Sequence, residues 1–449
     1  MQKIIVVGSG GREHAIAWRL AQSPSVDKII CVPGNGGTKN ESKCSNVSLE
    51  AAKGLDGNPY VAIAKKEGCS LAVIGPEDPL AEGLADEFWK AGIPCVGPKK
   101  TAAQLEASKD LAKAFMKKHS VAAPASETFT DQGAAVEYIK KRGAPIVLKA
   151  DGLAAGKGVV VAKTLDQAID AVDDIMNSGR VGNAGKKLVV EDYLAGIEMS
   201  VLAAVSVTPQ GAKEGKAAIL PFLPARDHKR LNDGARGPNT GGMGAVCPLE
   251  DVTPAIMEQF DKDILRPTLK GMIKEGYDYR GFIFFGVMIT KDGPKLLEYN
   301  VRLGDPETQA VLPLMDFDFA ALCDAIAGET LKGFDLKWKN EFSVAPVAVS
   351  GGYPGSYQKG KRIFIDEKKI QENGAKIFVA GAIDGRRESA EGYKENSLVT
   401  SGGRVLAVCA KGKTFDEAWQ KAYAAMQGVT FDGIFFRKDI GLPGAAVSD

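Results

Sequence analysis

Short apolar runs alternate with a helical pattern along the N-terminal part of the chain. The apolar runs that predict buried strands lie at residues 3–7, 28–32, 71–74 and 94–97. Between the first two runs, residues 14–20 have the apolar spacing of a helix. Because buried strands that alternate with helices are typical of parallel sheets, we predict a doubly wound α/β domain over residues 1–105.

A helix at residues 108–119 begins the second part of the chain, with Ser108 as its candidate N-cap. Strands then predominate, and glycine-rich loops separate them. The predicted strands lie at residues 146–150, 159–162, 188–190, 199–207, 282–290 and 295–300. The turn at residues 291–294 predicts a hairpin between the last two strands, and a helix is predicted at residues 317–327. We assign residues 106–334 to this second domain.

The remaining residues, 335–449, predict a small α+β domain. Its predicted strands lie at residues 344–349, 377–380 and 405–409, and a helix follows at residues 415–425. The expected fold class is therefore a multidomain protein that combines α/β and α+β parts. A length of 449 residues agrees with about three domains.

Charge and cysteine content exclude several classes of function. The chain has 57 Lys and Arg against 56 Asp and Glu, so its net charge of +1 favours neither nucleic acid nor an anionic membrane as a partner. No apolar run approaches the ~18 residues of a spanning helix, and residues 3–7 already predict a strand, so we expect neither a membrane segment nor a signal peptide. The seven cysteines are scattered and odd in number, which argues against a disulfide framework or a zinc site and favours the cytoplasm.

Two glycine-rich turns follow the first two predicted strands. The first, GSGGREH at residues 8–14, opens a helix and suits anion binding by backbone N–H groups. A dinucleotide fingerprint would need a third glycine where Glu13 stands, and PGNGGT at residues 33–38 replaces the acidic residue that would bind a ribose. A nicotinamide enzyme is therefore disfavoured. Two such turns at adjacent strand ends still indicate a phosphate-bearing ligand, with tight turns that bind nothing as the alternative.

A third glycine loop, DGLAAGKGV at residues 151–159, joins two predicted strands. It is not a Walker A loop, because Gly158 rather than Ser or Thr follows Lys157 and because no helix follows the loop. A glycine flap between antiparallel strands can close over nucleotide phosphates, and Lys149 on the preceding strand can supply a positive charge. The alternative is an ordinary glycine hairpin with a solvated Lys157.

Glu298 and Asn300 end a predicted strand, where positions i and i+2 face the same side. One carboxylate and one amide oxygen suit Mg²⁺, which completes its shell with phosphate and water. Arg302, Asp305 and Glu307 follow directly, and the guanidinium can bind a carboxylate or phosphate. The alternative is the solvated face of an ordinary strand.

The loops DHKR at residues 227–230 and GPNTGGMG at residues 237–244 are polar and rich in glycine. A loop of this kind is costly to order without a ligand. His228 is one of only three histidines, but a lone histidine is more often structural, so we assign it no proton transfer. A solvated loop remains the alternative for the basic residues here.

The order of these motifs resembles the ATP-grasp ligases, and the flanking motifs resemble one family among them, the phosphoribosylamine–glycine ligases. The motifs are VVGSGGREHAIAW, PGNGGT, IGPEDPL, SKDLAKAFM, LKADGLAAGKGVVVA, DHKR, GPNTGGMGA and LEYNVRLGDPETQ. The likeness covers nearly the whole chain and weakens after residue 335. It implies an ATP-grasp fold for residues 106–334, with a lid subdomain at about residues 122–192.

The resemblance also implies a reaction. ATP, glycine and 5-phosphoribosylamine would give glycinamide ribonucleotide, ADP and phosphate through a glycyl phosphate, as a step of purine biosynthesis. The implied cofactors are ATP and Mg²⁺, with Mn²⁺ as an alternative ion. The implied partners are small-molecule substrates, with no nucleic acid or membrane. The implied oligomeric state is a monomer or a small homo-oligomer.

Site residues follow by the same resemblance, position by position. ATP would contact Lys109, Lys149, Gly156, Lys157, Gly158, Glu191, Tyr193, Leu194 and Glu198, of which residues 190–194 form the adenine hinge and Glu198 binds the ribose. The phosphoribosylamine side would include Gly10, Gly11, Asn35, Gly36, Gly37, Thr38 and Glu77, and the substrate loops Asn239 and Thr240. Asp227, Arg302, Asp305 and Glu307 would face glycine and the reacting centre, and Glu298 and Asn300 would bind the metal.

Two positions depart from the family pattern. Ala235 stands where the family usually has the second Asp of Asp-Gly-Asp, so a metal or substrate role there is in doubt. Residues 379–382 read Val-Ala-Gly-Ala instead of His-Ala-Gly-Thr, which leaves mainly a packing role for that strand.

Two other functions remain as alternatives. Another ATP-grasp ligase, such as a carboxylase, would share the outline of residues 109–307 but not GGREH and PGNGGT. A non-catalytic nucleotide-binding regulator would be expected to lack Lys149, Glu298 or Asn300, and all three are present.

Overall fold

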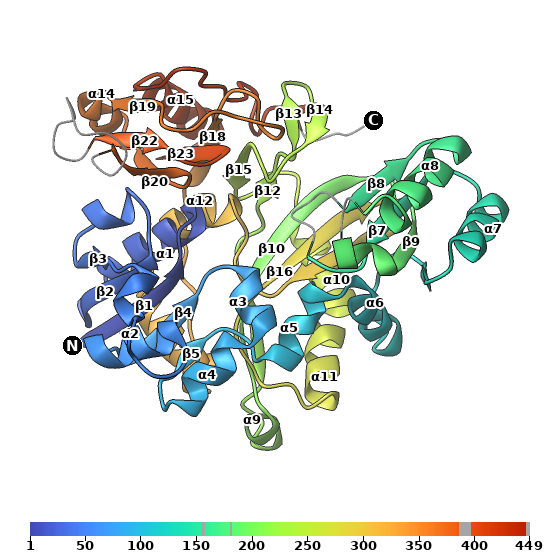
Figure 1. Ribbon diagram of the computed structural model, residues 1–449, viewed down its shortest axis with the longest axis horizontal. Helices are drawn as coiled ribbons and strands as arrows, with labels where there is room; N and C mark the ends of the chain where they lie inside the picture. The colour runs from blue at the N-terminus through green and yellow to red at the C-terminus, as the bar shows by residue number, and fades with distance from the viewer. Residues whose placement is uncertain (154–157, 180–181, 386–396, 446–449) are drawn as a thin grey trace.

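The computed structural model describes residues 1–153, 158–179, 182–385 and 397–445. Figure 1 shows the N-terminal sheet in blue, the C-terminal part in red above it, and a green and teal subdomain that projects on the opposite side. Long strands of a central sheet run between these parts. Gly156 and Lys157, which we expected to contact ATP, lie outside the described residues.

The N-terminal sheet has five parallel strands in the order β3-β2-β1-β4-β5. Its elements are β1 Gln2–Gly8, α1 Gly11–Ala21, β2 Val26–Pro33, β3 Cys44–Asn46, α2 Pro59–Glu67, β4 Leu71–Ile74, α3 Glu77–Glu82, α4 Leu84–Lys90 and β5 Cys95–Val96. The predicted parallel α/β arrangement is confirmed. The edge strand β3 escaped prediction because Cys-Ser-Asn has no apolar pattern.

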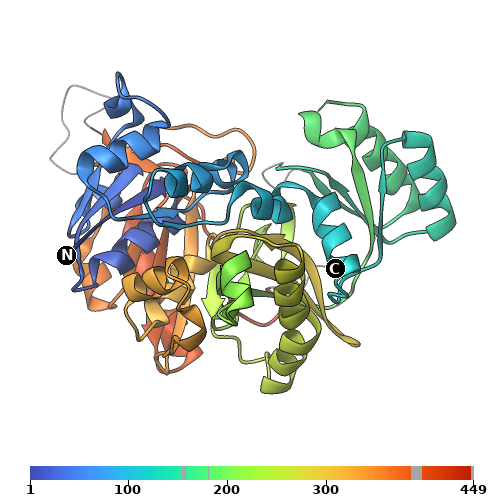
Figure 2. The same ribbon diagram turned by 90° about the horizontal axis from the view of Figure 1, so that it is seen from below.

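The projecting subdomain is a four-stranded antiparallel sheet in the order β6-β9-β7-β8, which we call the lid sheet. Its elements are β6 Ser126–Phe129, α7 Gln132–Arg142, β7 Ile146–Ala150, β8 Val159–Ala162, α8 Leu165–Met176 and β9 Leu188–Asp192. Both helices pack on the sheet and bury a hydrophobic core of their own, which includes Ile139, Leu148 and Val172. Figure 2 shows this subdomain standing apart from the N-terminal sheet.

The central antiparallel sheet has the order β11-β10-β16-β17. Its strands are β10 Ile197–Val207, β11 Ala218–Pro221, β16 Tyr279–Thr290 and β17 Gly293–Asn300. Neighbouring helices are α5 Lys100–Ala107, α6 Lys109–Lys118, α9 Pro209–Lys213, α10 Pro254–Phe260, α11 Arg266–Lys274, α12 Glu307–Val311 and α13 Phe319–Ala327. The predicted hairpin between β16 and β17 and the Ser108 N-cap of α6 are both present.

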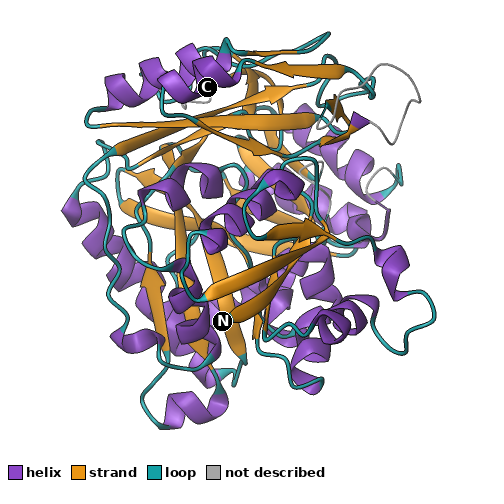
Figure 3. Cartoon of the chain, turned by 90° about the vertical axis from the view of Figure 1, so that its left-hand side faces the viewer, coloured by secondary structure: helices purple, strands orange, loops and turns teal. Residues whose placement is uncertain are grey.

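The C-terminal part contains two sheets, of which one is shared with the preceding part of the chain. The shared sheet has the order β12-β15-β18-β23-β20, from β12 Arg226–Asp227, β15 Gly244–Cys247, β18 Phe342–Val349, β20 Lys376–Val379 and β23 Arg404–Gly412. The second sheet, β21-β22-β19-β24, is built from β19 Arg362–Ile365, β21 Ala382–Asp384, β22 Leu398–Thr400 and β24 Val429–Thr430, and the helices are α14 Glu367–Glu372 and α15 Phe415–Met426. Figure 3 shows helices flanking these sheets.

A small hairpin, β13 Arg230–Asn232 and β14 Arg236–Asn239, lies between β12 and β15 in the chain. Its turn includes Ala235 at a left-handed φ of 54°, a conformation that costs a residue with a Cβ. The departure from the family pattern at this position therefore falls on the turn of a hairpin.

Within the described ranges, the structure contains no helix that is both long and apolar enough to cross a bilayer.

Candidate active site

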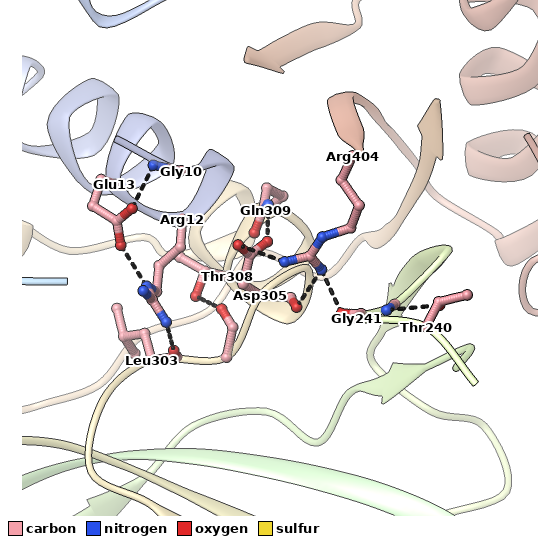
Figure 4. A network of polar contacts seen from close by, with 12 residues as sticks. Gly10, Arg12, Glu13, Thr240, Gly241, Leu303, Asp305, Thr308, Gln309 and Arg404 are labelled. Carbon is pink, nitrogen blue, oxygen red and sulfur yellow. Dashed lines mark hydrogen bonds and ion pairs between the residues drawn. The ribbon is translucent and has the colours of Figure 1, made fainter. Parts of the chain in front are cut away.

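The N-terminus of α1 is occupied by a side chain of its own first turn. Glu13 accepts the backbone N–H of Gly10 at 2.6 Å and pairs with Nε of Arg12 at 2.5 Å (Figure 4). Glycines make room for this carboxylate, since an added Cβ at Gly75 would lie 2.1 Å from its Oε1. The helix N-terminus that we expected to suit an anion thus already binds one within the chain.

The side chain of Asn35 holds the PGNGGT turn in place through hydrogen bonds to backbone groups. Its amide donates to the carbonyls of Ser9, at 2.8 Å, and Val379, at 2.7 Å, and its oxygen accepts the N–H of Gly37 and Thr38 at 2.8 and 3.0 Å. Thr38 is fully buried, and the Gly36 N–H donates to the carbonyl of Ala382 at 3.0 Å. This turn therefore joins the first loop to the C-terminal part, and its side chains are engaged within the protein.

The backbone of strand β20 forms hydrogen bonds with side chains of the N-terminal domain. The N–H of Val379 donates to Nδ1 of His14 at 2.8 Å, while Nε2 of His14 lies 2.9 Å from Glu41. Burial lowers the pKa of His14, which agrees with a neutral ring that accepts at Nδ1. The departure at residues 379–382 leaves these backbone contacts in place.

Arg302 lies between two carboxylates. Its guanidinium is 3.0 Å from Glu106 and 3.2 Å from Glu77, and Glu77 also lies 3.7 Å from Arg12. Glu106 is buried and accepts the Val301 N–H at 2.7 Å. Burial raises the pKa of Glu106 to about 7 although Arg302 opposes the shift. Glu77 and Glu106 together fix the orientation of the Arg302 side chain.

Asp305 is held by a residue from the shared C-terminal sheet. Nη2 of Arg404 lies 3.0 Å from its carboxylate, and Nη1 donates to the Asp305 carbonyl at 2.7 Å and to the carbonyl of Gly241 (Figure 4). Gln309 donates to the other carboxylate oxygen at 2.7 Å. Burial would raise the pKa of Asp305, but Arg404 and Arg12 hold it below its usual value. An added Cβ at Gly10 would lie 3.5 Å from this carboxylate, so the first glycine loop borders the same place.

Asp227 and Glu307 form an acidic pair near Asp305, in which Glu307 is buried and Asp227 is half-buried. Glu307 accepts the Ser200 hydroxyl at 2.9 Å, whereas Oδ1 of Asp227 is buried without a hydrogen-bond partner among the described residues. Burial, and then the charge of Glu307, raise the pKa of Asp227. An unsatisfied buried oxygen is costly, which marks this atom as a place for a donor from a ligand.

His228, next to Asp227, is structural in its contacts. Its Nδ1 lies 3.3 Å from the Gly244 carbonyl, and its Nε2 accepts the Gly441 N–H at 3.0 Å. Burial, with the cation of Arg437, lowers the pKa of His228 to about 3, so the ring is neutral at ordinary pH.

The base of the glycine flap is tied to the start of α6. Asp151 accepts the Ser108 hydroxyl at 3.0 Å and the Asp110 N–H at 3.2 Å, and Nζ of Lys109 donates to the Gly152 carbonyl at 2.9 Å. The flap joins the antiparallel strands β7 and β8, and the Ala150 N–H donates to the Gly158 carbonyl at 2.7 Å. The expectation of a glycine flap between antiparallel strands is confirmed.

Glu191 on β9 lies between two lysines rather than in solvent. Its carboxylate is 3.0 Å from Lys149 on β7 and 3.2 Å from Lys113 on α6. The loop that follows β9 contains Tyr193 and Leu194, both half-buried, and connects the lid sheet to the central sheet. The predicted hinge residues therefore lie where the two sheets meet.

Glu198 lies at the start of β10 in the central sheet, and its carboxylate lies 2.6 Å from Nζ of Lys229. Burial would lower the pKa of Lys229, but Glu198, Glu298 and Asp227 hold it well above its ordinary value. This lysine therefore stays charged between three acidic side chains of the site.

Glu298 and Asn300 lie two residues apart on β17, with the buried Tyr299 between them. Burial would raise the pKa of Glu298, but Lys229, Lys149 and Lys109 hold it below its usual value, so the carboxylate is ionised. Over the described ranges, no three His, Cys, Asp or Glu side chains gather as a metal-binding group. One carboxylate and one amide fit a Mg²⁺ ion that takes its other ligands from phosphates and water.

Asn239 ends the small hairpin, and Thr240 follows it. Thr240 is fixed through its hydroxyl and its N–H, which both donate to the Lys229 carbonyl at 2.7 Å, while Asn239 is exposed on β14. Thr240 thus shapes the loop beside Gly241, and Asn239 is free to face solvent.

Sequence reasoning missed six charged residues that touch this site: Arg12, Glu13, Glu106, Lys113, Lys229 and Arg404. Lys113 could have been found, since it follows Lys109 by four residues and so shares a helix face with it. Arg404 could not, because 99 residues separate it from Asp305 and only the shared sheet brings them together.

Three family models match the chain in succession. Residues 2–106 match the phosphoribosylglycinamide synthetase N domain, residues 107–308 its ATP-grasp (A) domain, and residues 343–443 its C domain. Together they cover most of the chain, which confirms the expected ATP-grasp fold in its centre.

Relatives and solved structures agree with these matches. A phosphoribosylamine–glycine ligase of Clostridium acetobutylicum is 47% identical over 440 residues, 98% of this chain and 99% of that protein. One of Vibrio parahaemolyticus is 42% identical, covering 98% and 97%. The crystal structure of the Thermotoga maritima phosphoribosylamine–glycine ligase has a TM-score of 0.77 at 34% identity, covering 98% of this chain and all of that one.

A more distant likeness concerns the fold alone. The biotin carboxylase domain of Hydrogenobacter thermophilus 2-oxoglutarate carboxylase, solved with MgADP and bicarbonate, has a TM-score of 0.68 at 15% identity, covering 97% of this chain and 91% of that one. Since identity, coverage and all three family models point to one group of ATP-grasp enzymes, the chain belongs to the phosphoribosylamine–glycine ligase family.

Proposed function

We propose that this protein joins glycine to 5-phosphoribosylamine at the expense of ATP, giving glycinamide ribonucleotide, ADP and phosphate. Membership of the family supports this reaction. The single structural observation that supports it best is the set of basic side chains around Glu298: against the effect of burial, Lys229, Lys149, Lys109 and Arg302 together hold the pKa of this half-buried carboxylate below its usual value. A polyanion and a carboxylate can react there only if their charges are balanced.

In the first step, a glycine carboxylate oxygen attacks the γ-phosphorus of ATP, ADP leaves, and glycyl phosphate forms. Glu298 and Asn300 would hold Mg²⁺, or Mn²⁺ in its place, and this ion supplies charge neutralisation between the phosphates. Lys149 and Lys109 would contact the phosphates, as would Gly156, Lys157 and Gly158. The hinge at residues 190–194 would border adenine, and Glu198 the ribose.

In the second step, the amine of phosphoribosylamine attacks the glycyl carbonyl carbon, phosphate leaves with the broken C–O bond, and the nitrogen loses a proton. The loops of Gly10, Gly36 and Glu77 would border this substrate. Asp227 and Glu307, whose pKa values burial raises, would face glycine together with Asp305 and Arg302. The unsatisfied Oδ1 of Asp227 suits the ammonium group of glycine.

Some aspects of this proposal lie outside the chemistry of the site. We propose that the enzyme acts on small molecules, because its near-zero net charge offers no field for a polyanionic partner. We also propose that it works in the cytoplasm, as a monomer or small homo-oligomer. Size-exclusion chromatography with light scattering measures the oligomeric state.

One assay tests the reaction. Purified protein with ATP and Mg²⁺ should release phosphate only when glycine and freshly formed phosphoribosylamine are both supplied, and mass spectrometry should detect glycinamide ribonucleotide. Bicarbonate in place of glycine is the discriminating control, because a carboxylase shares this fold. Phosphate release with bicarbonate, or none with the two proposed substrates, would refute the assignment.

A further inference from the structure

Lys113 lies beside the nucleotide site but is engaged within the protein. It is on α6, one turn after Lys109, and its side chain is only 7% exposed. Its Nζ lies 3.2 Å from Oε1 of Glu191 and donates to the Leu297 carbonyl at 3.0 Å. Because both contacts use the ammonium group at close range, Lys113 is better placed to orient neighbours than to bind a phosphate itself.

The carbonyl that Lys113 contacts is made available by an irregularity of the sheet. On β17, Glu298 is paired with Gly286 and Leu296 with Val287, so Leu297 between them is the extra residue of a β-bulge. A bulged residue leaves the regular ladder and can direct its carbonyl elsewhere. The carbonyl held in this way belongs to the peptide group that joins Leu297 to Glu298.

Lys149 shares both partners of Lys113. Its Nζ lies 3.0 Å from Oε2 of Glu191 and 3.3 Å from the Leu297 carbonyl. Two ammonium groups therefore share one carboxylate and one carbonyl, and the carboxylate is 2% exposed. Removing one partner from such a buried group leaves a charge without its balance, which disturbs the others strongly.

These four groups come from four different elements. Lys113 is on α6, Lys149 and Glu191 are on β7 and β9 of the lid sheet, and Leu297 is on β17 of the central sheet. The cluster thus joins the two sheets that would lie on either side of ATP, next to the proposed metal ligand Glu298.

We propose that Lys113 is a positioning residue of the nucleotide site, which holds Glu191 and the Leu297 carbonyl so that Lys149 faces the phosphates and Glu298 faces the metal. The inference rests on the proposed function for the identity of the nucleotide. It assigns Lys113 no direct contact with substrate. It predicts that loss of its charge weakens nucleotide and metal binding together, although neither ligand touches it.

The test compares Lys113→Met with Lys117→Met in the full-length protein. Lys117 lies one turn further along the same helix, and its side chain is 82% exposed. Calorimetric titration with MgADP should show Kd raised by about 10-fold or more in Lys113→Met and unchanged within about 2-fold in Lys117→Met. Lys113→Arg should restore part of the affinity, because a guanidinium can bridge the same carboxylate and carbonyl.

Kinetics separate positioning from mere stability. In Lys113→Met, KM for ATP and the Mg²⁺ concentration for half-maximal rate should both rise, whereas KM for glycine should not. A Lys113→Met protein that melts at a lower temperature but binds MgADP as the parent does would overturn the proposal. If this variant does not fold, Lys113→Gln, which can still donate to the Leu297 carbonyl, replaces it with the same expected loss of affinity.

A double-variant cycle adds an independent measurement. Glu191→Gln should weaken MgADP binding, and adding Lys113→Met to it should cost less than in the parent, because the two residues act as one unit. Full additivity would count against the shared cluster. Since MgADP binding needs no turnover, these results stand or fall separately from the glycine and phosphoribosylamine assay.

Discussion

The guanidinium of Arg404 lies 3.0 Å from the carboxylate of Asp305, although the two residues belong to different parts of the chain. Arg404 begins β23 of the shared C-terminal sheet, and Asp305 lies in the loop after β17. Arg404 also donates to the carbonyl of Gly241. Two loops of the proposed reaction centre are therefore held by one side chain from the C-terminal part.

Arg404→Met should lower kcat by about 10- to 100-fold, because hydrogen bonds to a charged group contribute about 1.5–3 kcal/mol. Arg404→Lys should recover only part of this, since an ammonium group cannot reach the Asp305 carboxylate and both carbonyls with the same geometry. Lys411→Met on the same strand, which pairs with Glu341, is the matched control. Steady-state kinetics under saturating substrates measure the effect, and an unchanged kcat would contradict the role of Arg404.

Glu298→Gln should abolish turnover, with a loss of at least about 100-fold in kcat, because the metal would lose its one charged protein ligand. The substitution keeps the size of the side chain, so the melting temperature should change little. Asp292→Asn, in the exposed turn of the same hairpin, removes the same charge and should retain activity. Turnover in Glu298→Gln at parental Mg²⁺ concentrations would remove the metal assignment.

Asn35→Ala should lower the free energy of unfolding by about 2–4 kcal/mol, because the side chain binds backbone groups of both the N-terminal loops and β20. Asn40→Ala, which removes a single hydrogen bond from an exposed residue to the carbonyl of Gly36, should cost much less. Chemical denaturation followed by circular dichroism provides both values. Equal losses in the two variants would show that the buried hydrogen bonds of Asn35 contribute little to the free energy of unfolding.

Nucleotide affinity should fall as the pH rises through about 8. Burial lowers the pKa of Lys113 to about 8, while Glu191 opposes this shift and Lys149 adds to it; Glu298 also opposes it. Below that pH the ammonium group is charged and holds the cluster, and above it the group is neutral. Lys113→Arg should shift this alkaline loss to higher pH, because a guanidinium stays charged.

Calorimetric titration of MgADP between pH 7 and 9.5 measures this dependence. The control is Lys117→Arg, at the exposed position one turn away, which should follow the parent curve. An identical pH dependence in the parent and in Lys113→Arg would assign the alkaline loss to another group.

The elements that the sequence predicted are those with strong local patterns. Strands β4, β7 and β8 were predicted to the residue, since β4 and β8 are short apolar runs bounded by polar residues or glycine, and β7 is an apolar run with one lysine between Pro145 and Asp151. Strands β12 and β15 were not predicted. The two residues of β12 give no period, and β15 pairs with β18, about a hundred residues later in the chain.

The site shows the same division between local and distant information. The flap between antiparallel strands followed from glycines within one loop, and Glu298 with Asn300 followed from the period of a strand. The roles of Glu13 and Asn35 did not follow from their motifs. The motifs gave no sign that Glu13 also caps its own helix, or that Asn35 also binds backbone groups as far away as Val379.

The shared sheet has a consequence for how this protein can be divided. Strand β15 stands between β12 and β18, so a fragment that starts near residue 335 would present the bare edge of β18 to water and to other fragments. Such a piece should self-associate when produced alone, and adding residues 218–247 as a second polypeptide should restore its solubility. Gene fragments for this protein should therefore keep β15 and β18 in one polypeptide.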